Sequence, residues 1–439
     1  MVEQPAFRLL LSGDSMITRR PTLARDPATR GLRDLIREAD LAFTNLEVLP
    51  NDFRGFGAAE SGGTHLAAHS WVVDELLDMG FDLVSAATNH ALDYSIEGLL
   101  ATIEVLETKG LPFAGIGRNL AEARMPVYLD HPAGTLALVS CCSTFIRGQE
   151  AAEQRPDLPG RPGLNPLRYD RVFDVTAAQL TALREVAEAL GVERQRLELI
   201  QLGFGFPPDS PDYFPFLGQS FRAAERADVM VSPKTKDVDA IASWVREARG
   251  RADLVAVSVH AHEEGADREQ PADFISAFAR RMVDEGADLV VGHGPHLLRG
   301  MELYQSKPIF YSLGNFIAQN DLVYKVPADA YDRFRVDPTS TPGQLFAARS
   351  GHGTKGFPGD PRYWQSVLPI CRFTGRALQE IELVPLTLGH GESVVHRGQP
   401  RLASGDEAVG ILARFAALSE PFGTRLGIDG DRALVQLAR

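Results

Sequence analysis

Residues 286–293 read GADLVVGH, and residues 80–90 read GFDLVSAATNH. In each stretch a glycine ends a helical pattern, a short apolar run follows, and polar residues come directly after that run. A buried strand entered from a helix in this way is typical of a βαβ unit. The two stretches therefore predict an α/β fold whose polar groups collect at the carboxyl ends of the strands.

The same alternation continues on both sides of these stretches. The predicted strands are Phe7–Ser12, Ala39–Thr44, Asp82–Ala87, Thr135–Cys141, Asp253–Val259, Asp288–Gly292 and Ile309–Leu313. The predicted helices between them are Trp71–Met79, Ile96–Thr108, Val238–Ala248 and Phe274–Glu285.

Two stretches break the alternation, at about 148–236 and 318–368. The first contains one clear helix, Ala177–Leu190, between the N-cap Thr176 and the stop at Gly191. The second is polar, with few periodic apolar residues. Long loops inside a compact domain usually serve as lids or substrate walls. We expect a single domain over 1–439 with these two insertions and a closing strand and helix extension at 376–439.

Charge and composition exclude some classes of protein. The 439 residues are 44% hydrophobic and carry a formal charge of -13. That balance suits a globular core but neither duplex nucleic acid nor an anionic membrane, since both bind a positive face. No apolar segment approaches 18 residues, and the N-terminus lacks the pattern of a signal peptide. We expect a cytoplasmic protein with no nucleic-acid and no membrane partner.

Candidate functional residues cluster just past the predicted strands. They are Asp14, Glu47, Asn89, His90, His260, His262, Glu263, His293 and His296. The carboxyl ends of parallel strands meet at one edge of a sheet, so these side chains are expected to converge. Oxygen and imidazole donors without thiolate favour Ca, Mn, Mg, Fe or Zn. The sequence thus predicts a site for one or two divalent metal ions.

Five motifs then carry a resemblance to a known family. GDSM (13–16), TNLE (44–47), TNHALD (88–93), the His260 segment and GHGPH with YSLGNF (292–316) follow the order and spacing of the CapA-like family. That family is named for capsule and poly-γ-glutamate synthesis proteins and resembles the calcineurin-like metallophosphatases. The match covers roughly residues 7–145 and 235–317.

The resemblance implies a fold and a site. The expected fold is the calcineurin-like metallophosphatase fold, a two-sheet α/β sandwich with flanking helices. Carried over by motif, the implied metal ligands are Asp14, Glu47, Asn89, His260 and His293, with His296 a ligand or its neighbour. His90 is the implied acid or base beside them.

The sequence also departs from the family pattern. Calcineurin-like phosphatases open with Asp-x-His, whereas this chain has Asp14-Ser15-Met16. One metal position therefore loses a donor, and a two-metal clamp on phosphate needs both ions. Carboxylates and imidazoles freed in this way are available for proton transfer, so we expect the chemistry to have changed.

One activity implied by soluble members of the family is that of the lasso-peptide epimerase, which inverts the Cα of the C-terminal residue of a ribosomally made precursor peptide. Capsule-type relatives usually carry an N-terminal membrane anchor, so the expected absence of one disfavours an export role. Epimerisation needs a base on one face of the Cα and an acid on the other. The pairs Asp14/His296 and His90/Asp93 are the candidate catalytic residues, with His262, Glu263 and Asn315 as supporting neighbours.

Further residues are candidates for contacts with the peptide substrate. Arg19 and Arg20 are candidates to hold its carboxylate, although a solvated turn before Pro21 is the alternative. Aromatic residues of the two insertions are candidate walls of a peptide groove: Tyr213, Phe214, Phe216, Tyr331 and Phe334.

Two other hypotheses about the function stay open. The first is a metal-dependent phosphoesterase or hydrolase of the CapA type, acting on a small phosphoester or an anionic polymer with the same residues. The second is a metal-stabilised binding protein for an anionic peptide or polymer. The number of bound ions separates the first of these from epimerisation: two tightly bound transition ions favour hydrolysis, and one hard or weakly held ion favours proton-transfer chemistry.

Overall fold

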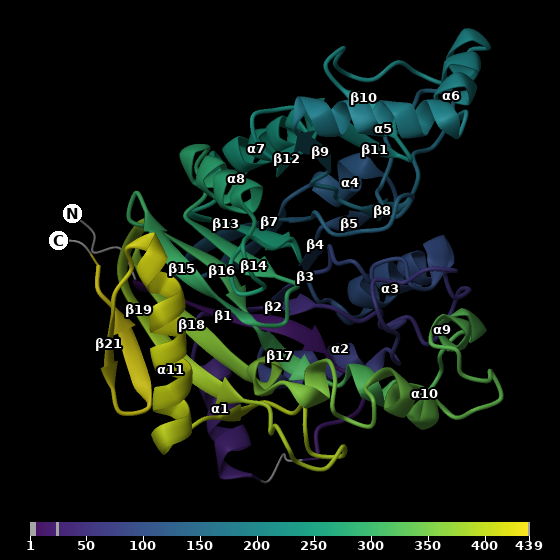
Figure 1. Cartoon of the computed structure of the whole chain (residues 1–439). Helices are drawn as coiled ribbons and strands as arrows, with labels where there is room; N and C mark the ends of the chain where they lie inside the picture. Colours follow the sequence, from purple (N-terminus) through teal and green to yellow (C-terminus); the bar gives the residue numbers. More distant parts are fainter. Residues whose placement is uncertain (1–5, 23–25, 438–439) are drawn as a thin grey trace. The chain divides into compact units, whose positions relative to one another are not determined.

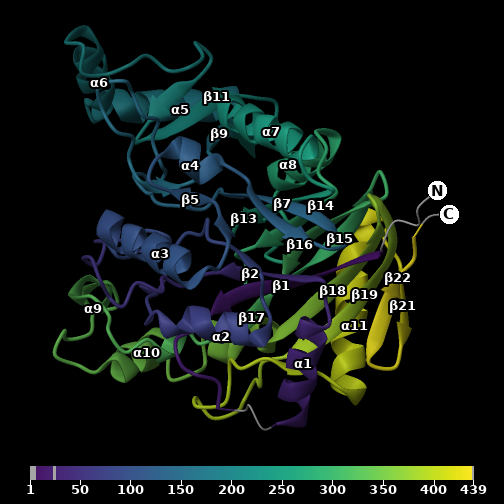
Figure 2. The same cartoon turned by 180° about the vertical axis from the view of Figure 1, so that it is seen from behind.

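The computed structural model describes residues 6–22 and 26–437. The chain forms two compact units, one of Met1–Leu167 with Asp239–Arg439 and one of Arg168–Val238. Figure 1 and Figure 2 show the elements from two sides. The predicted metal ligands and catalytic residues all belong to the first unit, whereas the candidate wall residues Tyr213, Phe214 and Phe216 belong to the second.

The first unit contains a large mixed sheet in the order β21-β22-β19-β18-β1-β2-β3-β4, with β17 also paired to β1 and β20 to β19. Its strands are β1 (Ala6–Met16), β2 (Leu41–Leu46), β3 (Leu83–Ser85), β4 (Phe113–Ala114), β17 (Asn315–Ala318), β18 (Gln365–Thr374), β19 (Ala377–Thr387), β20 (Arg401–Leu402), β21 (Leu426–Asp429) and β22 (Arg432–Val435). β1, β2, β3 and β4 run parallel, which is the arrangement that the βαβ pattern predicts.

A second sheet in the same unit has the order β15-β16-β14-β13-β7-β6. Its strands are β6 (Val127–His131), β7 (Gly134–Cys142), β13 (Leu254–His260), β14 (Leu289–His293), β15 (Leu298–Tyr304) and β16 (Lys307–Leu313). The central strands β7, β13, β14 and β16 are parallel, so their carboxyl ends reach the same edge. A small ladder joins β5 (Ile116–Gly117) to β8 (Gly163–Leu164).

The hydrophobic core lies between these two sheets. Along β1, Leu9 and Leu11 pack in a cluster with Leu254 and Val291 of the second sheet. Leu10, which points to the opposite face because strand side chains alternate, packs instead with residues of the helices. The expected two-sheet α/β sandwich with flanking helices is therefore confirmed.

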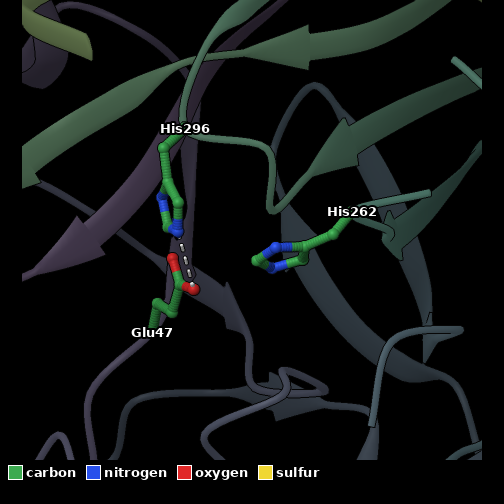
Figure 3. Close-up of side chains that lie close together, drawn as sticks. All are labelled: Glu47, His262 and His296. Atoms are coloured by element: carbon green, nitrogen blue, oxygen red, sulfur yellow. Dashed lines mark ion pairs between the residues drawn. The ribbon is translucent and has the colours of Figure 1, made fainter. Parts of the chain in front are cut away.

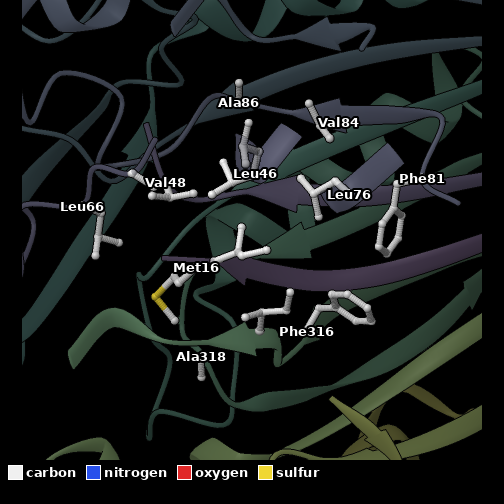
Figure 4. Packing of buried hydrophobic residues seen from close by; sticks show 14 of the residues in the cluster. Met16, Leu46, Val48, Leu66, Leu76, Phe81, Val84, Ala86, Phe316 and Ala318 are labelled. Atoms are coloured by element: carbon white, nitrogen blue, oxygen red, sulfur yellow. The ribbon is translucent and has the colours of Figure 1, made fainter. Parts of the chain in front are cut away.

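Helices cover the outer faces. The helices of the first unit are α1 (Pro27–Arg37), α2 (Trp71–Met79), α3 (Ser95–Lys109), α4 (Leu120–Arg124), α8 (Asp273–Asp284), α9 (Ala328–Arg333), α10 (Pro342–Arg349) and α11 (Gly405–Ser419), with short turns η1 (Asn320–Leu322), η2 (Phe357–Gly359), η3 (Pro361–Trp364) and η4 (Glu420–Phe422). Figure 4 shows Leu76 and Phe81 packing with Phe316 and Leu46 over the large sheet. α8 packs on β14 and β16, and α11 on β15 and β19.

Local sequence explains where several helices begin and end. The Asp26 carboxylate accepts a hydrogen bond from the Ala28 N–H, and Pro27 occupies the first turn of α1. α2 ends at Gly80, whose φ of 106° is in the left-handed region that favours glycine. This is the glycine that opens the GFDLV stretch, and β3 begins three residues after it, at Leu83.

The unit Arg168–Val238 has its own sheet and core. Its sheet has the order β10-β11-β9-β12. Its elements are β9 (Tyr169–Val175), α5 (Ala177–Ala189), α6 (Val192–Gln201), β10 (Phe214–Phe216), β11 (Gln219–Ala223) and β12 (Asp228–Pro233), and α7 (Thr235–Arg249) divides between the two units. Thr176 is the N-cap of α5 as predicted and also forms a capping box with Gln179. Gly191 is in turn the N-cap of a further helix, α6, that was not predicted.

The boundaries of the first insertion need a correction. Residues 148–167, predicted to lie in it, belong to the first unit because β8 pairs with β5 and Ala151 packs against Leu120 and Ala123. The proposed wall residues Phe214 and Phe216 pack in the small unit's own cluster around Leu180.

The segment 318–368 contains more regular structure than predicted. α9 and α10 form a small cluster in which Tyr331 and Leu345 pack together, with Phe334 beside them. The tail 376–439 forms the strands β19, β20, β21 and β22 and the helix α11, and β21 is the edge strand of the large sheet. Over residues 6–22 and 26–437, none of the helices has the length and apolarity needed to span a bilayer.

Candidate metal centre

Asp14 lies on β1 where that strand pairs with the parallel strand β17. The register of β1 shifts between Leu11 and Asp14, and the Asp14 N–H donates to the Gly314 carbonyl at 3.0 Å. Gly13 leaves room for this approach, since a Cβ there would stand 1.9 Å from the Gly314 oxygen. The glycine of the GDSM motif is thus required by the close contact of two backbones.

Glu47 is the centre of the cluster. It follows β2, is completely buried, and places Oε1 3.6 Å from His296 Nε2, 3.7 Å from His260 Nε2 and 3.9 Å from His90 Nε2. Neither of its carboxylate oxygens has a hydrogen-bond partner among the described residues. Figure 3 shows Glu47 paired with His296 while His262 points into the same space.

Two overlapping groups of side chains have the composition and spacing of a metal site. Glu47, His262 and His296 form one group, and Asp14, Glu47 and His260 form the other, with the donor atoms of each within 4.8 Å of one another. Glu47 belongs to both. Buried carboxylates are normally hydrogen-bonded or paired, so its two unpartnered oxygens fit a ligand that a divalent cation completes.

The electrostatics of the cluster agree with that fit. Burial raises the pKa of Glu47 well above its usual range, and the charges of Asp14 and Asp93 raise it further. Burial lowers the pKa of His260 to about 3 and that of His293 to about 4. Neutral imidazoles are the form that binds metal, and a cation would favour the ionised form of Glu47.

Asp14 is the firmly ionised carboxylate of the site. Burial opposes its ionisation, but the hydrogen bond and charge of His296, with the charges of His293 and His260, hold its pKa well below the usual range. Asn45 Nδ2 donates to its Oδ1 at 2.9 Å, and the Gly294 N–H donates to its Oδ2 at 3.1 Å. Asp14 therefore stays charged and fixed in orientation.

His296 presents Nε2 to the cluster. Its Nδ1 lies 2.9 Å from Asn315 Oδ1 and 3.3 Å from Asp14 Oδ2. Because an amide oxygen only accepts, Nδ1 donates, which leaves Nε2 facing Glu47. Asn315 is itself held by a 3.0 Å bond to the Tyr363 carbonyl. Such outer partners of a ligand set its tautomer and angle.

His260 and His262 complete the group from the second sheet. His260 Nε2 lies 3.0 Å from Asn89 Oδ1 and 3.1 Å from His262 Nε2. On its other side, His260 Nδ1 lies 3.3 Å from Asn45 Nδ2. Gly294 has φ of 109°, and a Cβ there would stand 2.8 Å from the His262 ring. The GHGPH motif needs its second glycine for this reason.

His90 and Asp93 form a pair beside the cluster. Their spacing predicted one helical turn, and the structure has a tight turn in which the Asp93 N–H donates to the His90 carbonyl at 3.0 Å. His90 Nδ1 lies 2.7 Å from Asp93 Oδ2, which also accepts the Leu66 N–H at 2.7 Å. His90 Nε2 is left facing Glu47.

Other predicted residues stand outside the two donor groups. Glu263 accepts from the hydroxyls of Ser143 at 2.6 Å and Thr144 at 2.9 Å, so it anchors the loop that carries His262. His293 lies 3.5 Å from Asp14 but is in neither donor group. Met16, at the position of the missing family histidine, packs among apolar side chains (Figure 4).

Arg19 and Arg20 are not brought to the cluster. The Arg20 guanidinium lies over the Trp71 ring and 3.6 Å from Glu75, both on α2, and the Arg19 side chain is exposed. A cavity of about 210 Å³ opens at the cluster, with His90, His262 and His296 in its wall. The arginines that line it are Arg268, Arg299 and Arg349.

Sequence reasoning missed these three arginines and Asn45. Asn45 stands inside the TNLE motif, so its position there could have identified it. The arginines stand in no motif, and only folding brings them to one cavity. Arg299 is 1% exposed and donates to the carbonyls of Arg268 and His262.

The fold and the site together define a two-sheet α/β protein with a buried His/Asp/Glu cluster that has the composition of a metal site. The chain belongs to the family described as bacterial capsule synthesis protein PGA_cap, whose model matches residues 8–320.

Curated relatives agree with this family. The chain is 35% identical to "Uncharacterized protein y4sH" of Sinorhizobium fredii, over 98% of this chain and 93% of that one. It is 26% identical to "Capsule biosynthesis protein CapA" of Bacillus anthracis, over 66% and 54% of the two chains. Among solved structures, NAD nucleotidase of Haemophilus influenzae is 10% identical with a TM-score of 0.33, over 93% of this chain and 62% of that one.

Proposed function

We propose that this chain is a divalent-metal-dependent phosphoester hydrolase of the CapA type. The observation that carries the proposal is Glu47, a fully buried carboxylate with two unpartnered oxygens that faces three imidazoles. At this point the protein supplies donor atoms for a divalent cation, and among the described residues no Lys or Arg side chain forms an ion pair with Glu47. Membership of the capsule synthesis family supports a substrate in capsule or poly-γ-glutamate metabolism, either a small phosphoester or an anionic polymer.

The proposed ligands are Asp14, Glu47, His260, His262 and His296. A divalent ion held there supplies Lewis-acid stabilisation of negative charge on a phosphoryl oxygen. Met16 stands where the family pattern has a donor histidine. The number of ions that the site binds is therefore a quantity to be measured.

The remaining groups have roles around the phosphoryl group. Arg268, Arg299 and Arg349 line the cavity with positive charge, which stabilises a phosphoryl anion. His90, oriented by Asp93, donates a proton to the leaving oxygen. In the overall step a bond forms between water oxygen and phosphorus, the bond from phosphorus to the organic oxygen breaks, and the products are an alcohol and a phosphate.

The test combines metal analysis with turnover. We expect at least one equivalent of Mn, Fe or Zn by plasma mass spectrometry and hydrolysis of bis(p-nitrophenyl) phosphate. His90→Ala should keep the metal and lower kcat by about 10²- to 10⁴-fold, the usual contribution of a general acid. His396→Ala, which removes an exposed histidine outside the donor groups and the cavity, is the control for effects on folding. Metal-loaded protein without any phosphoester turnover would contradict the proposal.

A second candidate function is epimerisation at the Cα of a peptide residue. Two imidazole–carboxylate pairs, His90–Asp93 at 2.7 Å and His296–Asp14 at 3.3 Å, each contribute their histidine to the wall of the same cavity. Two such pairs can act as base and acid on opposite faces of a Cα. Incubation of a candidate precursor peptide in D₂O tests it: one deuteron gained at the C-terminal residue supports epimerisation, and no exchange rejects it for that peptide.

A further inference from the structure

A second cavity adjoins the one at the metal centre. It has a volume of about 510 Å³, in the range of cavities that hold small organic ligands. The two cavities share part of their walls: Arg268, Asn320, Arg349, Phe357 and Tyr363 line both. All of these residues belong to the same compact unit. A ligand whose anionic end reaches the metal centre therefore has the second cavity directly beside it.

Four aromatic side chains form part of the wall of the second cavity. Phe346, Phe357, Tyr363 and Trp364 line it, and the last two are only 5% and 3% exposed. The Phe357 and Tyr363 rings stack with centroids 4.4 Å apart, and Trp364 Nε1 donates to the Phe357 carbonyl at 2.7 Å. These contacts fix the rings in place before any ligand binds, which lowers the entropy cost of binding an apolar group.

The junction between the cavities is positively charged in a protein of net charge -13. Five basic side chains line the two cavities, against the acidic Glu264 and Asp321: Arg268, Arg299, Arg349, Lys355 and Arg397. Arg268 is 3.7 Å from Glu264, and Arg397 is paired with Asp321. Within the described residues, Arg349 and Lys355 make no ion pair with a carboxylate.

Arg349 stands at the point where the two cavities meet. It is carried by α10 and hydrogen-bonds to the Thr64 hydroxyl. The loop around Thr64 also contacts the metal centre, since a Cβ on Gly62 would stand 2.2 Å from Asn89 Nδ2. The Arg349 charge is thus positioned between the metal cluster and the aromatic wall.

We propose that the second cavity binds the organic group of the substrate, and that this group is apolar or aromatic. Arg349 holds the phosphoryl charge at the junction, and Phe346 forms part of the wall against the organic group. The assignment rests on the proposed phosphoester hydrolysis and names its substrate class, an anionic ester of an apolar or aryl alcohol.

The test measures binding without turnover. Isothermal titration calorimetry of Mn²⁺-saturated protein compares benzylphosphonate with methylphosphonate, two non-hydrolysable anions that differ in the apolar group. We expect benzylphosphonate to bind at least about 10-fold more tightly, the effect of burying one aromatic ring. Phe346→Ala should remove most of that preference, whereas Arg349→Gln should weaken both ligands by a similar factor.

Leu345→Ala is the matched control, because Leu345 is the neighbour of Phe346 on α10 but packs against Tyr331 instead of lining either cavity. It should keep the preference. Equal affinity for the two phosphonates, or a preference unchanged in Phe346→Ala, would overturn the assignment of the cavity.

Two further outcomes separate this inference from the function on which it rests. Tighter binding of N-acetylphenylalanine than of benzylphosphonate would assign the cavity to the aromatic carboxyl terminus of a peptide and overturn the ester class. Hydrolysis of bis(p-nitrophenyl) phosphate is measured on the same preparation. Hydrolysis without a preference for benzylphosphonate over methylphosphonate would reject the cavity assignment and leave the hydrolase proposal standing. That preference without hydrolysis would reject the hydrolase proposal and leave the cavity as a site for an apolar group.

Discussion

Two buried carboxylates at opposite ends of strands have opposite surroundings. Asp288 directly precedes β14 and is 1% exposed, and it lies 2.6 Å from Lys307 Nζ and 3.2 Å from Arg376 Nη1. It also accepts the Val255 N–H at 3.0 Å. Glu47 follows β2, is fully buried, and has imidazoles at 3.6 to 3.9 Å as its ion-pair partners. The protein thus provides permanently charged Lys and Arg side chains for one carboxylate and only titratable imidazoles for the other.

The difference separates a structural ion pair from a binding site. A buried charge is tolerated when it is paired and hydrogen-bonded, so Asp288 stabilises the junction of its strands. Glu47 without a bound cation is costly to keep ionised, because burial raises its pKa. Burial alone does not distinguish the two residues, whereas the presence or absence of partners does.

The largest expected effect is at Glu47. Glu47→Gln removes the ligand shared by both donor groups, so metal affinity should fall by more than about 100-fold, the upper range for the loss of a ligand's outer partner. The free energy of unfolding of the metal-free variant should equal or exceed that of wild type, since an unpaired buried carboxylate is gone. Metal content after dialysis and urea unfolding in EDTA measure the two quantities. A metal-free variant less stable than wild type would show that the neighbouring imidazoles stabilise the ionised Glu47 without a metal ion.

Asp288→Asn should have the opposite result. It leaves the Lys307 and Arg376 charges without their carboxylate, and we expect the free energy of unfolding to fall by about 3 kcal/mol. Metal bound per folded molecule should stay at the wild-type value because the cluster lies at the other end of β14. The same urea and metal measurements apply. Loss of metal in this variant would show that metal binding depends on Asp288 as well as on Glu47, and would contradict the assignment of Asp288 to a structural ion pair.

Two glycines on either side of β14 provide a smaller, matched comparison. Gly294 and Gly286 have φ of 109° and 119°, so alanine is strained by about 1–3 kcal/mol at either position. A Cβ at Gly294 also meets the His262 ring at 2.8 Å, whereas at Gly286 it meets the flexible Arg249 side chain. Both variants should lower Tm, and only Gly294→Ala should lower metal affinity, by about 10-fold. Equal metal affinities in the two variants would argue against His262 as a ligand.

The smallest effect is expected at the surface. Arg20 is 66% exposed by its side chain and lies 3.6 Å from Glu75. Exposed ion pairs contribute little, so Arg20→Ala should change the free energy of unfolding by less than about 1 kcal/mol. It should also leave KM for phosphoesters unchanged, since Arg20 does not line the cavity. A clear rise in KM would restore the predicted role of Arg20 in holding substrate.

The sequence predicted the sheets well where apolar runs were continuous. GADLVVGH became β14 and its flanking glycines, and the alternation of strands and helices predicted the α/β class, whereas the two-sheet sandwich was implied only by the resemblance to the CapA-like family. Short or polar elements were missed, including α6 and α10, because their side chains are half-exposed and show no strong periodicity. The first insertion was given too early a start, since the pairing of β8 with β5 joins residues far apart in the chain.

The sequence by itself determined which polar residues lie at the strand ends and which glycines end the helices before those strands, because both depend on local patterns. Tertiary structure alone decided that Glu47 faces His260 and His296, which lie more than 200 residues along the chain. It also brought Arg268 and Arg349 to the cavity while leaving Arg20 on α2. Whether a charge is paired or free depends on neighbours distant in sequence, and those neighbours are fixed only when the two sheets pack.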